Sequence, residues 1–262
     1  MKFYTSVQQA GNNIHVRGYQ NGIQFSHRVP FNPTLYLPTP QPSRWKTLAG
    51  DNVRPVKQGT IRDARKFVED HKEIPDFEIC GQTRYLNQYI SEEYPEDEIK
   101  FDSSSIRVFT LDIETAAENG FPDIETADQE ILLISLKDSQ TGRIQVFGRY
   151  AFANTHKDVD YMHFSTEDGM LKAFLHYWVS NFPDVITGWN VQLFDMTYIS
   201  KRIERVLGER DAKMLSPWKS TLCREIYIKG RKQIAYDISA SQRLTILSCI
   251  VSLRIQTNHL IV

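Results

Sequence analysis

The sequence contains few of the residues that build disulfide frameworks or zinc sites. Three cysteines occur in 262 residues, at Cys80, Cys223 and Cys249, and they are odd in number and far apart. The seven histidines are scattered without the spacing of metal ligands. The pattern therefore predicts neither a disulfide-stabilised fold nor a zinc knuckle.

Long apolar runs and an excess of charge of one sign are also absent. No run reaches the length that spans a membrane and no signal peptide opens the chain, so we expect a cytosolic protein with no membrane partner. The net charge of -1 argues against a protein that coats nucleic acid by bulk electrostatics, although a local groove stays open. With 41% hydrophobic residues, the chain can build the cores of one large or two ordinary domains.

The chain divides into a β-rich first region and a mixed second region. Residues 1–104 contain short strand-like runs separated by turn residues, of which Asn21 and Gly22 are typical of a β-hairpin. Thr60 and Asp63 predict the N-terminal cap of a short helix. An acidic stretch indicates the boundary, so we expect a smaller β-rich domain at the start of the chain.

Residues 105–239 follow a different order of elements. Three strands are predicted at 106–115, 131–136 and 144–147. A helix with an apolar stripe follows, capped at Ser165, and then a short strand and a second helix. This is the order of an α/β fold of the ribonuclease H-like type, in which a mixed sheet has flanking helices.

Two acidic spots belong to this second region. Asp112 and Glu114 are two residues apart in the first strand, so their side chains project from the same face. Neighbouring carboxylates repel each other unless a cation neutralises them, and oxygen ligands without histidine or cysteine favour Mg²⁺ or Mn²⁺. The alternative is that the two acids end a strand where the chain turns to solvent.

Context favours the metal site in two ways. The first strand looks apolar on both faces, which is typical of a covered central strand and makes an uncompensated charge at Asp112 costly. Asp195 follows a short apolar strand and opens the second helix, where the helix dipole favours the ionised carboxylate. An ordinary N-cap aspartate is the alternative for this position.

Basic residues are concentrated after Asp195. A phosphate backbone would need them there, and a solvated helical face explains the first few equally well. The set comprises Lys201, Arg202, Arg205, Arg210, Lys213, Lys219, Arg224, Lys229, Arg231 and Lys232.

Two segments resemble the first and second exonuclease motifs of family B DNA polymerases, in particular those of large tailed bacteriophages. The first is 109–114 (FTLDIE), followed by 119–122 (NGFP), and the second is 187–195 (TGWNVQLFD). Short segments at 31–36 and 215–217 are also similar to the family, and the resemblance spans residues 1 to about 239. It implies a proofreading 3′-to-5′ exonuclease domain preceded by the amino-terminal domain of such polymerases.

The resemblance also implies how the site would work. Asp112, Glu114 and Asp195 would be the catalytic residues and would hold two Mg²⁺ or Mn²⁺ ions for hydrolysis of the 3′-terminal phosphodiester. Phe121 would stack on a base of the frayed 3′ end, and a packed loop aromatic is the alternative for it.

Further nucleic-acid-binding residues are implied by the same resemblance. Asn190 would bond the terminal nucleotide, and Phe194 belongs to the same motif. Lys229 and Arg231 lie in the stretch 224–236, which resembles the β-hairpin that helps part template from primer; an ordinary surface hairpin is the alternative. The implied partners are the 3′ end of single-stranded DNA and primer-template DNA, RNA through the amino-terminal domain, and a sliding clamp in the full-length polymerase only. As a phage protein, it would act in the host cytoplasm.

The chain also departs from the family. No Tyr-x-x-x-Asp motif follows Asp195, and the palm, fingers and thumb are absent, so we interpret the chain as an amino-terminal fragment with weak or lost exonuclease activity. The alternative is an inactive remnant that only binds single strands. From 240 to 262 the sequence no longer resembles the family. When these residues are back-translated and the codons are read one nucleotide out of register, the resemblance returns. We expect an out-of-frame, poorly ordered tail there, with a split gene or an intron as alternatives.

Overall fold

The structure is a computed structural model that describes residues 2–75, 77–81, 84–95, 100–118, 120–228 and 231–245. The chain splits into two compact units, residues 1–101 and 102–262, whereas the sequence placed the boundary at 104. None of the helices in the described ranges is both long enough and apolar enough to cross a membrane.

Among its described residues, the first unit contains two small antiparallel sheets and two helices. One sheet has the order β1-β2-β3, and its second turn lies at the predicted hairpin residues Asn21 and Gly22. Thr60 caps α1 as expected, because its hydroxyl accepts the Asp63 N–H while the Asp63 carboxylate accepts the Thr60 N–H. The elements are β1 (Lys2–Ala10), β2 (Asn13–Gln20), β3 (Ile23–Pro30), β4 (Thr34–Pro38), β5 (Trp45–Lys46), β6 (Asn52–Lys57), α1 (Ile61–His71) and α2 (Tyr85–Glu93).

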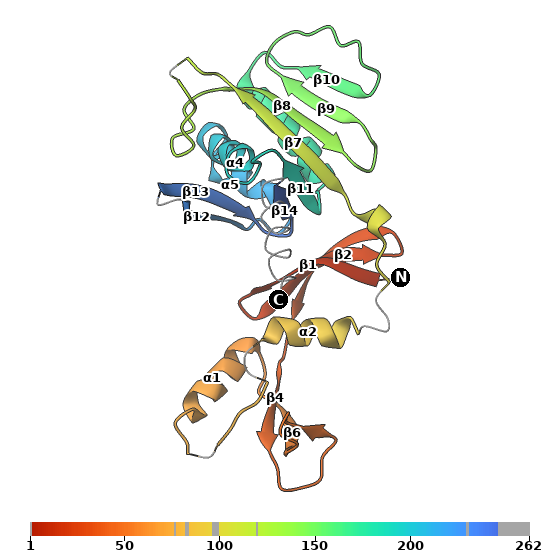
Figure 1. Ribbon diagram of the computed structural model, residues 1–262, viewed down its shortest axis with the longest axis vertical. Helices are drawn as coiled ribbons and strands as arrows, with labels where there is room; N and C mark the ends of the chain where they lie inside the picture. The colour runs from red at the N-terminus through yellow and green to blue at the C-terminus, as the bar shows by residue number, and fades with distance from the viewer. Residues whose placement is uncertain are drawn as a thin grey trace, which may run out of the picture. The chain divides into compact units, whose positions relative to one another are not determined.

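The second unit is built on a mixed six-stranded sheet of order β10-β9-β8-β7-β11-β14 (Figure 1). β7, β8 and β9 are antiparallel neighbours, whereas β10 runs parallel to β9, and β11 and β14 run parallel to β7. The strands are β7 (Val108–Thr115), β8 (Ile131–Asp138), β9 (Ile144–Gly148), β10 (Val159–His163), β11 (Val185–Gly188) and β14 (Gln242–Thr245). This mixed sheet with flanking helices is consistent with the predicted ribonuclease H-like fold.

Helices and a hairpin complete the second unit. The bounds are η1 (Ser103–Ser105), α3 (Glu167–Ser180), α4 (Asp195–Val206), α5 (Glu209–Ala212), η2 (Lys213–Leu215), β12 (Thr221–Ile228) and β13 (Arg231–Ile238). The apolar stripe of α3 is buried as expected, and Trp178 at its end is fully buried and donates its indole N–H to the Leu215 carbonyl (2.9 Å). The cap of α3 is Thr166, one residue later than predicted, because its hydroxyl accepts the Gly169 N–H.

The core lies on one face of the sheet, which corrects the expectation that β7 is apolar on both faces. Phe109, Leu111 and Ile113 are buried in a cluster with residues of α3 and α4. Thr110, Asp112 and Glu114 alternate with them and are exposed. The extra apolar residue Val108 is only partly buried. Asp112 and Glu114 therefore share a face, as predicted, but this face is open rather than covered.

The sheet differs from the sequence prediction at both ends. The edge strand β10 was not predicted, because a run of five residues with two polar side chains gives a weak strand signal. At the other edge, β14 pairs with β11 inside the stretch that was expected to be a poorly ordered tail. Ala240 and Ser241 just before it are buried, and the Ser241 hydroxyl donates to the Pro183 carbonyl (2.9 Å). Residues 246–262 lie outside the described residues.

Candidate nuclease site

The end of β11, where the chain leaves the strand toward α4, runs close to the backbone of β7. A Cβ atom at Gly188 would lie 2.4 Å from the Leu111 carbonyl oxygen, so only glycine permits this approach. Asn190 then turns the chain with a positive φ of 54°, a conformation that asparagine tolerates better than most residues. Its carbonyl accepts the N–H groups of Leu193 and Phe194, both at 3.0 Å. The turn delivers the next residue, Asp195, to the edge of β7.

Asp195 is anchored on the strand that carries the first acidic motif. The pairing of β11 with β7 ends at Thr110, which leaves the edge of β7 uncovered beyond that residue. The Oδ1 atom of Asp195 accepts the Ile113 backbone N–H there, at 3.2 Å. The side chain is the first of α4, as predicted, and Asp195 is 3% exposed. The second motif is therefore held directly against the first.

Burial changes the protonation of Asp195 in the direction opposite to the expectation from the helix dipole. Loss of water and, to a smaller extent, the Asp112 and Glu114 carboxylates raise the pKa of Asp195 to about 6. The backbone N–H groups of Asp195 itself and of Ile113 lower the pKa but are outweighed. The position concentrates negative charge that a cation would relieve.

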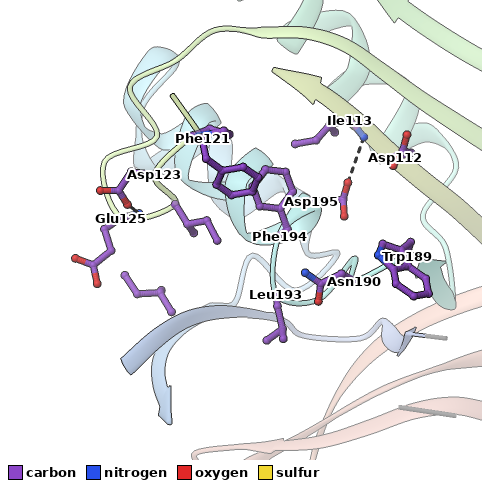
Figure 2. Close-up of a pocket in the computed structure, with 13 residues that line it drawn as sticks. Asp112, Ile113, Phe121, Asp123, Glu125, Trp189, Asn190, Leu193, Phe194 and Asp195 are labelled. Atoms are coloured by element: carbon purple, nitrogen blue, oxygen red, sulfur yellow. Dashed lines mark hydrogen bonds between the residues drawn. The ribbon is translucent and has the colours of Figure 1, made fainter. Parts of the chain in front are cut away.

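Asp112 and Asp195 line one cavity of about 690 Å³ (Figure 2). Glu114 lines a different cavity beside Leu133 and Tyr161 on the open face of the sheet. Within the described ranges, no three side chains of the metal-binding types cluster closely enough to hold one ion. The structure brings two of the three predicted ligands to one cavity and leaves Glu114 outside it.

The two carboxylates in the cavity fit a hard divalent cation by their chemistry. Both offer oxygen ligands only, one of them buried with a raised pKa, and both belong to neighbouring backbone segments. Asp112 is exposed on the cavity side, so an ion can reach it from solvent. Glu114, two residues along the same face of β7, is the nearest further carboxylate on that strand.

Aromatic side chains form the opposite wall of the cavity. Phe121 is 83% exposed and its ring centroid lies 5.4 Å from that of Phe194 (Figure 2). Phe194 in turn stacks on Tyr198 of α4, with 5.7 Å between the ring centroids. Asn190 also lines the cavity, beside Trp189, which is 64% exposed and was not predicted as a site residue. The available signal in the sequence was a tryptophan directly after a strand end and before a turn residue.

Of the ten basic residues singled out after Asp195, four form ion pairs within the described part of the chain, namely Lys201, Arg202, Lys213 and Arg224. Arg202 is buried and pairs with Glu167, so it cannot face a phosphate backbone. Lys201 pairs with Glu204. Of the hairpin candidates, Lys229 lies outside the described residues, and for Arg231 only its place as the first residue of β13 is described.

Comparisons with known proteins agree with the motifs. A family model described as DNA polymerase family B, exonuclease domain, matches residues 71–246. The DNA-directed DNA polymerase of Enterobacteria phage T4 is 31% identical over 262 residues, which cover 89% of this chain and 29% of that protein. The DNA-directed DNA polymerase of Escherichia phage RB69 is 29% identical over 248 residues, which cover 84% of this chain and 27% of that protein. The chain thus spans less than a third of these relatives, and the family match covers more than half of the chain. The chain therefore belongs to DNA polymerase family B and carries the exonuclease domain of that family.

Proposed function

We propose that the second unit hydrolyses the 3′-terminal phosphodiester of single-stranded DNA and releases nucleoside monophosphates. The observation that carries this proposal is the contact of Asp195 with the backbone of β7, which holds it in one cavity with Asp112. Exonuclease domains of this family generally use divalent metal ions. Asp112 and Asp195 would hold such ions, Mg²⁺ or Mn²⁺, and Glu114 would add a carboxylate from the same face of β7.

The cavity wall supports a role in holding the strand. Phe121 presents an exposed ring in the cavity that the two acids line, and such rings stack on unpaired bases. The Phe194 ring packs against the Phe121 ring, and the side-chain amide of Asn190 would bind the terminal nucleotide. Lys229 and Arg231 of the β12–β13 hairpin would contact the strand further along.

The chemistry divides between the ions and the protein. Divalent ions held by Asp112 and Asp195 would supply activation of the attacking water and stabilisation of the leaving 3′ oxygen. Asp195 and Asp112 would hold these ions in the cavity that the aromatic wall lines, and Phe121 would keep the terminal base from pairing again. Removal of a carboxylate ligand should therefore reduce turnover more than strand binding.

An oligonucleotide assay tests this function. A 5′-labelled single strand should be shortened slowly from its 3′ end with Mg²⁺ or Mn²⁺ and remain intact with a chelator. Asp112→Asn should lower the rate by about 100-fold or more. Asp211→Asn on α5 removes the same charge outside the cavity and serves as the matched control, with unchanged activity expected.

The same assay separates the two candidate functions. If the unmodified chain binds the strand tightly but does not shorten it, the function is single-strand binding and not hydrolysis. Neither binding nor shortening would refute both. Use of RNA in place of DNA tests whether the first unit binds RNA. In that unit the ring centroids of Tyr36 and Trp45 lie 5.4 Å apart, and the two side chains line a cavity with Arg44 and Lys57. Aromatic rings with neighbouring cations are typical of single-strand binding.

Activities of a complete polymerase are a separate matter. Primer-template DNA would be the substrate of the full-length enzyme, with a sliding clamp as its partner. Because the two relatives are phage proteins, we propose that this chain acts in the host cytoplasm.

A further inference from the structure

One face of α4 binds the loop that forms the aromatic wall. Tyr198, Arg202 and Arg205 lie on the same side of the helix as Asp195, at spacings of three and four residues. Their donors reach four consecutive carbonyl oxygens of the segment 126–129. Arg205 donates to Thr126 (3.0 Å), Arg202 to Ala127 and Asp128 (2.8 and 2.9 Å), and Tyr198 to Gln129 (2.7 Å).

Arg202 is the centre of this arrangement. Its Nε and Nη2 atoms donate to the two carboxylate oxygens of Glu167 at 2.8 and 2.6 Å, and both side chains are 10% exposed. Glu167 also accepts the Ile131 backbone N–H at 2.8 Å. The guanidinium therefore joins α4, the start of α3 and the segment that leads into β8, with every contact largely shielded from water.

Gln129 extends the arrangement to the exposed aromatic. Its side-chain amide donates to the Gly120 carbonyl at 3.1 Å, one residue before Phe121. Its own Oε1 is buried without a hydrogen-bond partner among the described residues, so the side chain is used for this one contact. The helix that begins with Asp195 thus also fixes the backbone from which Phe121 projects.

We propose that Arg202 is a positioning residue that sets the place of Phe121 relative to Asp195. Arg202 holds the Ala127 and Asp128 carbonyls in register with α4, and Gln129 transmits this register to the turn at Gly120. The proposal rests on the proposed function, because the placement of Phe121 matters there for recognition of the 3′-terminal base.

A base-discrimination measurement tests this role. Fluorescence anisotropy, measured with a chelator present to prevent hydrolysis, gives the affinities for two single strands. One strand has a 3′-terminal base and the other ends in an abasic 3′ nucleotide. The unmodified chain should prefer the terminal base by about tenfold, because stacking of one base on an aromatic ring is worth that much. Phe121→Ala should abolish this preference, and its ratio of affinities is the reference value for a chain without the stacking ring.

Two variants probe the positioning residues separately. Arg202→Lys keeps the charge beside Glu167 but has one nitrogen in place of the three that reach Glu167 and the carbonyls. Gln129→Met keeps the Arg202–Glu167 pair and loses only the link to Gly120. Both should bring the preference close to that of Phe121→Ala. Lys201→Gln, the neighbour that pairs with Glu204 outside this network, should retain it. A merely structural effect would weaken binding of both strands and leave their ratio unchanged.

Each outcome decides between the two proposals. Wild-type preference in both Arg202→Lys and Gln129→Met would overturn the positioning role while leaving the nuclease proposal intact. Absence of any preference in the unmodified chain would count against base recognition itself. In that case amide hydrogen exchange at residues 120–125 decides the positioning role: faster exchange in both variants supports it, and unchanged exchange refutes it.

Discussion

Replacement of Asp195 by asparagine is expected to stabilise the metal-free protein by about 3 kcal/mol near pH 8. The reason is the pKa of Asp195, which burial raises to about 6. In the unfolded chain the same group titrates near its ordinary value of 3.8. Asparagine can still accept the Ile113 N–H, and it carries no charge at any pH.

The sign follows from proton linkage. Below about pH 4 the carboxyl is protonated in both states, so its contribution to stability is fully present and the two proteins should be similar. As the pH rises toward 6, the folded state retains a proton that the unfolded state has lost, and stability falls. Above about pH 6 the ionised group is buried at full cost, and the difference between the proteins levels off.

Urea unfolding in a chelator across this pH range measures the effect. The stability difference between Asp195→Asn and the unmodified chain should grow from near zero to its maximum between about pH 4 and 6. A difference that does not change with pH would show that Asp195 titrates as an ordinary surface acid.

The second large effect concerns the buried ion pair of Arg202 and Glu167. Glu167→Gln removes the negative charge and leaves the guanidinium buried without its partner, which should lower the free energy of unfolding by about 3 kcal/mol. The contact with the Ile131 N–H can persist, so the loss reports on the charge pair. Urea unfolding of the two proteins at neutral pH measures it.

The adjacent residue provides a matched control. Asp168 also lies in the first turn of α3, but its pair with Lys172 is largely in water. Asp168→Asn should therefore change stability little, since exposed pairs contribute little. Equal losses in the Glu167 and Asp168 variants would contradict the importance assigned to the buried pair.

Local signals in the sequence were sufficient for the parts of the fold set by short-range chemistry. The cap at Thr60 and the turn at Asn21 and Gly22 depend on neighbouring residues, so they could be predicted directly. The apolar stripe of α3 has a helical period that does not depend on its partner. Asp195 was correctly placed at a helix start because the preceding apolar strand and the following period mark the boundary.

Properties set by distant contacts could not be predicted in the same way. The apolar residues of β7 did not reveal which face the helices cover, and the exposed face carries Asp112 and Glu114. The burial of Arg202 depends on carbonyls more than seventy positions away in sequence, so a basic residue that is a buried donor looked like part of a phosphate-binding set. The pKa of Asp195 likewise depends on burial, which a local helix-dipole argument omits.

The central claim is that Asp112 and Asp195 together hold a divalent cation. Calorimetric titration of Mn²⁺ into the unmodified chain and into single asparagine variants tests it most directly. We predict binding to the unmodified chain and to Asp211→Asn, and affinity lower by about tenfold or more in both Asp112→Asn and Asp195→Asn. Absence of Mn²⁺ binding in the unmodified chain, or undiminished binding in the Asp195 variant, would contradict the account.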